Sequence, residues 1–245
     1  MIDRTLLYTV ADIQLGVGDY EFSKGFAIYK KGAVNYIEKD FSGYSAVVSG
    51  THDYIVNVSM SSYDRGVCNC YLGERNELCK HMIALAIALV YKFRPKDTKI
   101  IDIPLDQAVC SGQIRNITQA EVENFKEEIK KDLSFIKSYN GSSSKWFQYQ
   151  DSLTKGSRLI LLALSKLPIC KDSVLICIDI LKKLDKKILR GVDDSDGTVG
   201  CLMENIVELL NMFVTDDSDL KDFIKEKLPK GEAFDWETGF STFNN

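Results

Sequence analysis

Hydrophobic and polar residues follow different patterns in the two halves of the chain. Between residues 25 and 60, β-branched and aromatic residues occur in short runs with a period near two, separated by turn-forming residues. Such alternation is typical of strands that bury one face. The pattern predicts strands at 25–30, 33–38, 44–49 and 54–60, with hairpin turns between neighbours.

Two helical segments flank these predicted strands. The first lies within residues 5–15, where apolar residues recur at helical spacing, and it would end at Gly16 and Gly18. The second begins near His81 as a continuous apolar run and extends to about Phe93. We expect the second helix to cover the buried face of the sheet.

From residue 118 onward the apolar period lengthens to that of a helix. Thr118 and Glu121 form a capping box, and apolar residues then recur at i+3 and i+4. The pattern predicts an all-α region that is either a bundle or a short stack of helix pairs. Its five amphipathic helices are expected at 118–140, 144–166, 172–190, 198–213 and 219–228.

Composition indicates an ordinary globular protein, with 245 residues, 45% hydrophobic and 27% charged. Residues 1–100 contain 12 basic and 11 acidic residues, a net charge of +1, which leaves 19 and 24, a net charge of −5, for the remainder. Neither half has the strongly basic balance of proteins that hold duplex DNA through its phosphates. The N-terminus does not have the pattern of a secretory signal, and the longest apolar run spans about half a membrane, so a cytoplasmic protein without a membrane segment is expected.

Three of the seven cysteines and one of the two histidines fall within fourteen positions, as Cys68, Cys70, Cys79 and His81. Residues 67–71 predict a fifth strand, in which the side chains at i and i+2 share a face, so the first two thiols can converge. The second pair lies where the apolar helix begins. Three thiolates and an imidazole suit tetrahedral zinc, and a complete set of four protein ligands predicts one structural Zn2+ rather than a catalytic ion.

Enzymatic interpretations of these residues have less support. Catalytic thiols usually occur singly with a separate base, and a zinc or thiol hydrolase would need an open coordination position. The sequence contains no phosphate loop, nucleophile elbow, dinucleotide fingerprint or recognisable pair of catalytic carboxylates. An odd number of cysteines fits a reducing compartment better than a disulfide framework. We therefore expect a protein without catalytic residues.

The C-x-C-x8-C-x-H pattern, in which Cys79-Lys80-His81 leads into an Ala-rich apolar helix, resembles the SWIM zinc finger. The likeness extends over about residues 20 to 92 and includes a small β-meander ahead of the finger. Tyr71 stands where such fingers often have proline, which does not affect a ligand. The resemblance implies a DNA- or protein-interaction module, and prokaryotic stand-alone members look like accessory subunits. It therefore implies a protein partner, with an AAA+ ATPase or a similar complex as one class.

Together these patterns predict an α+β fold: a small antiparallel β-meander with a Cys3His zinc finger and covering helix, followed by an all-α helical bundle or short helical-repeat domain. The expected boundaries are 1–93 for the finger domain, 94–117 for a linker, 118–229 for the helical domain and 230–245 for a tail. The tail contains Phe234, Trp236 and Phe240 among acids and glycine, and it could pack on the helices or dock elsewhere.

Basic residues around the predicted finger support an alternative function, nucleic-acid binding through the finger face. Tyr71 would then stack on a base. Plain solvation is the commoner role of such charges, and contact with a phosphate or an acidic protein partner is the functional interpretation. They are Arg65, Arg75, Lys80, Lys92, Arg94, Lys96 and Lys99.

The remaining candidates predict structural roles. The acidic loop at residues 193–196 does not fit a calcium loop, because Val192 and Met203 would occupy its first and last ligand positions. His52 is expected in an exposed turn. Cys110 is left unassigned, and core positions are expected for Cys170, Cys177 and Cys201.

Overall fold

The computed structural model describes residues 6–41, 43–142 and 146–240, and the chain divides into two compact units, Met1–Asp102 and Ile103–Asn245. Each unit has its own hydrophobic core. The first combines helices with a four-stranded antiparallel sheet, and the described part of the second is helical. The expected α+β class is confirmed.

The sheet of the first unit is a meander whose spatial order β1-β2-β3-β4 follows the sequence. Every neighbouring pair is antiparallel, and hairpin turns join the first three strands. Alternate residues of the central strands are buried, as the period of two predicts. The strands are β1 (Val34–Lys39), β2 (Gly43–Ser49), β3 (Asp53–Ser59) and β4 (Gly66–Cys68).

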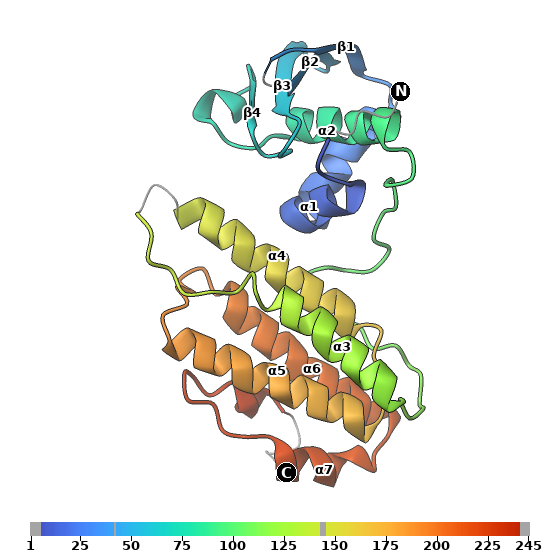
Figure 1. Cartoon of the computed structure of the whole chain (residues 1–245), viewed down its shortest axis with the longest axis vertical. Coiled ribbons are helices and arrows are strands. Elements are labelled where there is room, and N and C mark those ends of the chain that lie inside the picture. The colour runs from blue at the N-terminus through green and yellow to red at the C-terminus, as the bar shows by residue number, and fades with distance from the viewer. Residues whose placement is uncertain (1–5, 42, 143–145, 241–245) are drawn as a thin grey trace. The chain divides into compact units, whose positions relative to one another are not determined.

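Helix α2 (Lys80–Phe93) lies along the buried face of this sheet (Figure 1). Residues 81–90 are all buried, since the sheet covers one side of the helix and α1 (Val10–Lys30) packs against it as well. A helix that is apolar all round requires burial on more than one side. The predicted covering helix is therefore confirmed, and its continuous apolar run is explained.

The strand expected at 25–30 is wrong, because these residues form the last turns of α1. Phe22, Phe26 and Tyr29 follow one helical face. Phe26 stacks on Phe22 with ring centroids 5.6 Å apart, and Tyr29 meets Tyr91 of α2 at 4.7 Å. The apolar run at 25–30 is short enough to fit the period of a strand and that of a helix. Packing of Tyr29 on Tyr91 of α2, 62 positions later, selects the helix.

The first helix also continues beyond the end expected at Gly16 and Gly18. Gly18 has φ 78° and ψ 166°, which are not helical values, so the helix kinks there and then resumes. Thr9 caps the start of the helix and exchanges hydrogen bonds with Asp12 in a capping box. The glycine signal marks a kink rather than a stop.

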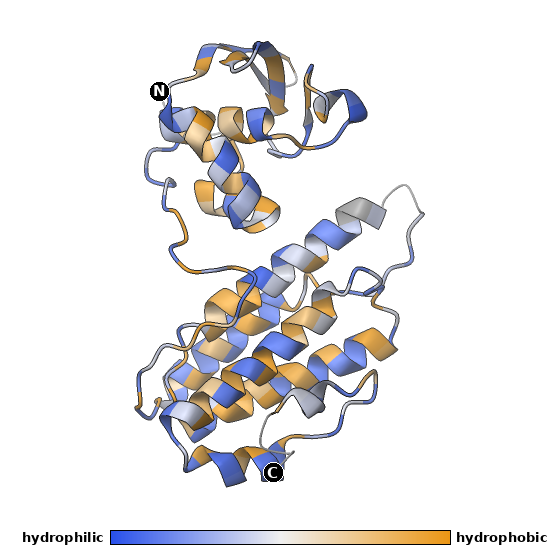
Figure 2. Cartoon of the chain, turned by 180° about the vertical axis from the view of Figure 1, so that it is seen from behind, coloured by the Kyte–Doolittle hydropathy of each residue, from blue (hydrophilic) through white to orange (hydrophobic). Residues whose placement is uncertain are grey.

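The second unit contains five α-helices among its described residues, and α6 packs against α4, α5 and α7 in a bundle. Apolar and polar residues alternate along these helices, as Figure 2 shows. Helix α6 is long and apolar enough by composition to cross a membrane, but its apolar residues line the core of this unit. The helices are α3 (Gln119–Asp132), α4 (Trp146–Leu164), α5 (Lys171–Leu189), α6 (Thr198–Asp216) and α7 (Leu220–Lys227).

Two helix boundaries differ from those expected. Helix α3 has the expected capping box at Thr118 but ends at Asp132 rather than near residue 140, because residues 134–136 form i→i−3 turns. Cys170 rather than Asp172 is the N-cap of α5. The predicted start of the second helix, at residue 144, lies outside the described residues.

The tail packs back on the helices, which decides between the two possibilities that the sequence leaves open. Trp236 and Phe240 are buried in the core of the second unit, around the 3-10 helix η3 (Trp236–Gly239). Asp185 of α5, itself buried, accepts hydrogen bonds from the backbone N–H groups of Glu232 and Ala233 and from the indole of Trp236.

Cys170 and Cys177 are buried, as expected, but the core position expected for Cys201 is wrong. Cys201 is exposed because it lies on the outer side of α6, next to the inward-facing Leu202 and Met203. Cys110 is half-buried, with its sulfur 3.7 Å from the carboxylate of Asp216.

The acidic loop before α6 caps that helix. The carboxylate of Asp194 accepts hydrogen bonds from the N–H groups of Val199 and Gly200, at 2.6 and 2.8 Å. Asp196 accepts another from the N–H of Thr198. Carboxylates at a helix N-terminus satisfy free donors and complement the helix dipole. The acids therefore have a local structural role.

Candidate metal centre

The first two cysteines come from the end of the sheet. Cys68 is the last residue of β4 and pairs with Val56, but Cys70 lies beyond the strand, so the fifth strand expected at 67–71 is shorter than predicted. Asn69 ends the pairing: its side-chain oxygen accepts from the N–H of Ile55, and its own N–H donates to the carbonyl of Ile55.

A compact turn then reverses the chain toward α2. The 3-10 helix η1 (Gly73–Arg75) is followed by Asn76 at φ 59°, a left-handed conformation that asparagine adopts more readily than most residues. The N–H of Glu77 donates to the carbonyl of Leu72, which closes the loop. Cys79 follows as the N-cap residue of α2, so the expected junction of loop and helix is confirmed.

This path brings the four candidate ligands together in a cluster. All four residues, Cys68, Cys70, Cys79 and His81, are buried, and their ligand atoms lie within 4.8 Å of one another. Nδ1 of His81 is 3.8 Å from Sγ of Cys68 and 3.9 Å from Sγ of Cys79. Tetrahedral zinc, with its usual bond lengths to sulfur and nitrogen, sets ligand atoms about 3.6–3.8 Å apart. The cluster therefore has the size and the donor set for one metal ion.

The imidazole of His81 is held in its neutral form. Its ring stacks on Tyr54 of β3, with centroids 4.0 Å apart and planes 19° from parallel. Burial, helped by the neighbouring charge of Lys80, lowers the pKa of His81 to about 4. Above that pH the imidazole is uncharged and has a lone pair available for a metal. His52, in contrast, is exposed as expected.

Burial and hydrogen bonds set how easily each of the three thiols ionises. Burial raises the pKa of Cys68 and of Cys79 above the ordinary value for a thiol. At Cys70 burial acts in the same direction, but hydrogen bonds, the largest from the N–H of Gly73, outweigh it and lower the pKa. A divalent ion would stabilise all three negative charges at once, which is the usual coupling of metal binding to proton release.

Gly73 gives a test of the metal-binding turn. A Cβ at Gly73 would lie 2.1 Å from the carbonyl oxygen of Cys68, so Gly73→Ala must displace that ligand's backbone. We expect zinc affinity to fall by about tenfold or more, as for other residues that orient ligands, measured by competition with a chromophoric chelator. Asn76→Gly is the matched control, because glycine adopts the same left-handed backbone easily. Equal affinity of the two variants would contradict the proposed ligand geometry.

The basic residues predicted around the finger are dispersed. Arg65 and Lys80 are exposed near the cluster, and Lys92 is exposed at the far end of α2. The helical rise separates Lys80 from Lys92 by about 18 Å along the axis. Lys96 and Lys99 are also exposed beyond the helix.

Two of the arginines have partners within the first unit. Arg75 lies over the ring of Tyr71 at 5.2 Å, donates to its hydroxyl, and pairs with Glu77 at 3.5 Å. Arg94 donates to the carbonyl oxygens of Leu6 and Tyr8 and pairs with Asp97 at 2.8 Å. Arg94 thus fastens the N-terminal segment.

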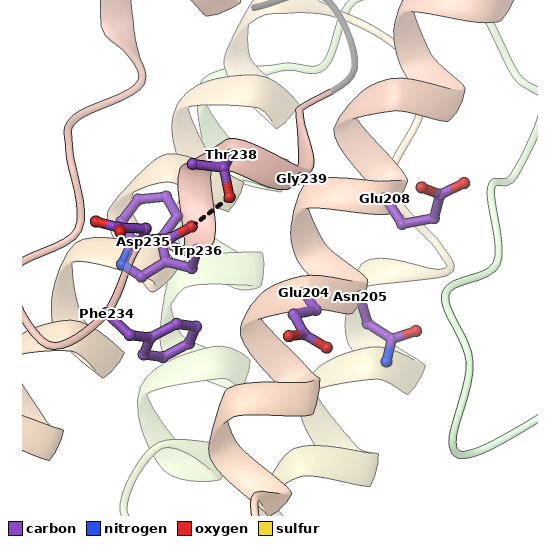
Figure 3. A pocket seen from close by; sticks show the side chains of 8 residues that line it. All are labelled: Glu204, Asn205, Glu208, Phe234, Asp235, Trp236, Thr238 and Gly239. Carbon is purple, nitrogen blue, oxygen red and sulfur yellow. Dashed lines mark hydrogen bonds between the residues drawn. The ribbon is translucent and has the colours of Figure 1, made fainter. Parts of the chain in front are cut away.

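Some residues of the structure could not be selected from the sequence pattern. Tyr54, which stacks on His81, gave no signal beyond its strand position, whereas Gly73 stands out as a glycine three residues after Cys70. A hollow of about 440 Å³ on the second unit is also unpredicted, since α6 and the tail form it together (Figure 3). Its lining includes Glu204, Glu208, Phe234, Asp235 and Trp236.

No protein-family model, curated protein or solved structure matches this chain. The likeness to the SWIM finger therefore rests on the ligand spacing and its surroundings.

Proposed function

We propose that the protein is a zinc-binding interaction module without catalytic activity, in which Cys68, Cys70, Cys79 and His81 hold one structural Zn2+. The single observation that carries this proposal is the buried Cys3His cluster. Thiolate and imidazole ligands in a closed set of four are characteristic of structural zinc, whereas catalytic zinc keeps one position for water.

The surroundings of the cluster support a structural role for the metal. The cluster joins the end of β4 to the start of α2, and Tyr54 packs on the imidazole. An ion here would link the sheet to its covering helix across a turn whose residues 74–77 are all exposed. Such links supply folding free energy in small domains.

A partner protein is the second part of the proposal. Helical bundles commonly present side-chain surfaces to other proteins. The resemblance to stand-alone SWIM proteins favours an accessory subunit of a larger assembly, such as one built on an AAA+ ATPase. We place the protein in the cytoplasm because an odd number of cysteines, three of them in the cluster, fits a reducing compartment better than a disulfide framework.

Nucleic-acid binding through the finger is the second candidate, and exposed Tyr71 favours it. The Tyr71 side chain is 71% exposed and lies beside Arg75. The local charge argues against nucleic-acid binding, because Glu74 and Glu77 balance the charges of Arg75 and Lys80. A protein partner therefore remains our conclusion.

The test is to purify the full chain without chelator, measure its metal content, and replace the ion with cobalt. One zinc per chain, and a cobalt spectrum with thiolate charge-transfer bands and tetrahedral d–d bands, are expected. Binding to single- and double-stranded DNA and RNA is then measured at several salt concentrations. Affinity that falls steeply with salt and weakens in the Arg75→Glu/Lys80→Glu double variant would favour the nucleic-acid function. A chain that folds without metal would refute the structural zinc.

A further inference from the structure

The first unit has a surface hollow of about 340 Å³, on the side where α1 and α2 both end. Side chains of α1, β1 and α2 form it, so segments far apart in the sequence meet there. Its volume lies at the small end of the usual range for ligand sites, about 300–1,000 Å³. That is room for one or two side chains rather than a large cofactor. The lining includes Tyr29, Val34, Ile37, Ala88, Tyr91 and Lys92.

The walls of this hollow are apolar, aromatic and already packed. Tyr29 and Tyr91 are half-buried, with ring centroids 4.7 Å apart, and Phe26 lies behind Tyr91 at 6.5 Å. Rings fixed in this way lose little conformational freedom when a partner binds. Aromatic side chains in a small concave site are the usual anchor points of protein interfaces.

The charge at the rim is positive. Lys92 lines the hollow, while Lys30 and Lys31, both exposed, directly precede its residue Gly32. None of the residues that line the hollow is acidic. Lysines in the last turn of a helix also complement the helix dipole, which affects stability rather than binding. The complementary ligand is an apolar side chain next to carboxylates.

We propose that this hollow binds a peptide segment of a partner protein that presents a large apolar side chain flanked by acidic residues. The inference rests on the proposed function as an interaction module and adds the chemistry of the partner. The lysines would attract and orient the acidic flanks, and the aromatic walls would bury the apolar side chain.

A nucleic acid fits this site less well. Tyr29 and Tyr91 pack on each other with their planes 30° apart, and Phe26 also packs on both, which leaves little ring face for a base. Residues 1–102 contain 12 basic and 12 acidic residues, so the unit has no net charge to attract phosphates.

The test uses the full zinc-loaded chain and fluorescent hexapeptides with Leu, Phe or Trp at the centre and Asp or Glu on both sides. We expect saturable binding by anisotropy for at least one of them. Peptides with lysine flanks, peptides with an alanine centre, and an oligothymidine are the comparison probes. Lys92→Glu should weaken binding about tenfold, whereas Lys126→Glu, the same charge change at an exposed lysine of α3 in the second unit, should not. Ala88→Leu, which fills the hollow from α2, should also weaken binding.

Several results would overturn the inference. They are no binding by any acidic peptide, equal binding by the lysine-flanked peptides, preference for the oligothymidine, or no effect of Lys92→Glu. Thermal unfolding of each variant is recorded, because an effect on stability alone would assign the lysines to the helix ends. Zinc content is measured on the same samples. A zinc-loaded chain that ignores the peptides refutes only the hollow, whereas a chain that folds without zinc refutes the proposed function.

Discussion

Replacing Cys79 by serine is expected to unfold the first unit and leave the second unit folded. The sheet has four strands of three to seven residues, and the chain between β4 and α2 is held by the Cys3His cluster. Zinc binding contributes on the order of 10 kcal/mol in small zinc domains, which is as large as the whole stability of a typical domain. Losing one of three thiolates should therefore unfold the sheet and α2 together at neutral pH.

The measurement is a two-dimensional NMR spectrum together with far-ultraviolet circular dichroism. The amide signals of residues 6–102 should collapse to the unfolded region, while α3 to α7 keep their dispersion and helical signal. Cys201→Ser is the matched control, since this thiol is exposed and outside the cluster. A chelator added to the unchanged chain should reproduce the Cys79→Ser result. Loss of both units in one transition would contradict the division near residue 102.

The Cys3His cluster was predictable because its sequence signal is local. Its four ligands fall within fourteen positions, so the spacing itself contains the geometry. The covering helix was equally clear, because its apolar run is unbroken. The turn between the two cysteine-containing pairs was harder to predict. The strand ends at Cys68, two residues before Cys70, because the side chain of Asn69 accepts the hydrogen bond of the Ile55 N–H.

The errors concern segments whose structure depends on distant partners. Residues 25–30 fit a strand and a helix equally well, and packing on Tyr91 selects the helix. Cys201 lies in an apolar run, yet the bundle buries its neighbours Leu202 and Met203 and leaves the thiol exposed. The tail packs on α5 and donates hydrogen bonds to Asp185, about 50 residues earlier. Local pattern contains no information about such contacts.

Replacing Asp185 by alanine is expected to destabilise the second unit by about 3 kcal/mol and to release the tail. The carboxylate is 5% exposed and accepts from Glu232 N–H at 2.9 Å, Ala233 N–H at 3.1 Å and the Trp236 indole at 3.0 Å. Each hydrogen bond to a charged group contributes about 1.5–3 kcal/mol, and donors left unpaired in the interior add a desolvation cost. Rearrangement of the tail toward water should recover part of that loss.

Two variants separate this anchor from general effects of mutating α5. Asp185→Asn keeps one acceptor oxygen but replaces the other with a donor, so we expect an intermediate loss. Asp179→Ala removes an exposed partner of Lys183, at 2.7 Å on the same helix, and should cost well under 1 kcal/mol. Chemical denaturation gives the free energies, and proteolysis at 230–240 reports the tail. If Asp185→Ala cost no more than Asp179→Ala, apolar packing of Trp236 and Phe240 would be sufficient to hold the tail.

The effect of Asp185→Ala should not depend on metal. Asp185 and the tail residues that it binds lie wholly within the second unit, and the Cys3His cluster lies wholly within the first. Denaturation of Asp185→Ala with zinc and with chelator should therefore give the same loss for the helical signal, because sites without shared partners contribute additively. A loss that changed with chelator would show that the two units stabilise each other.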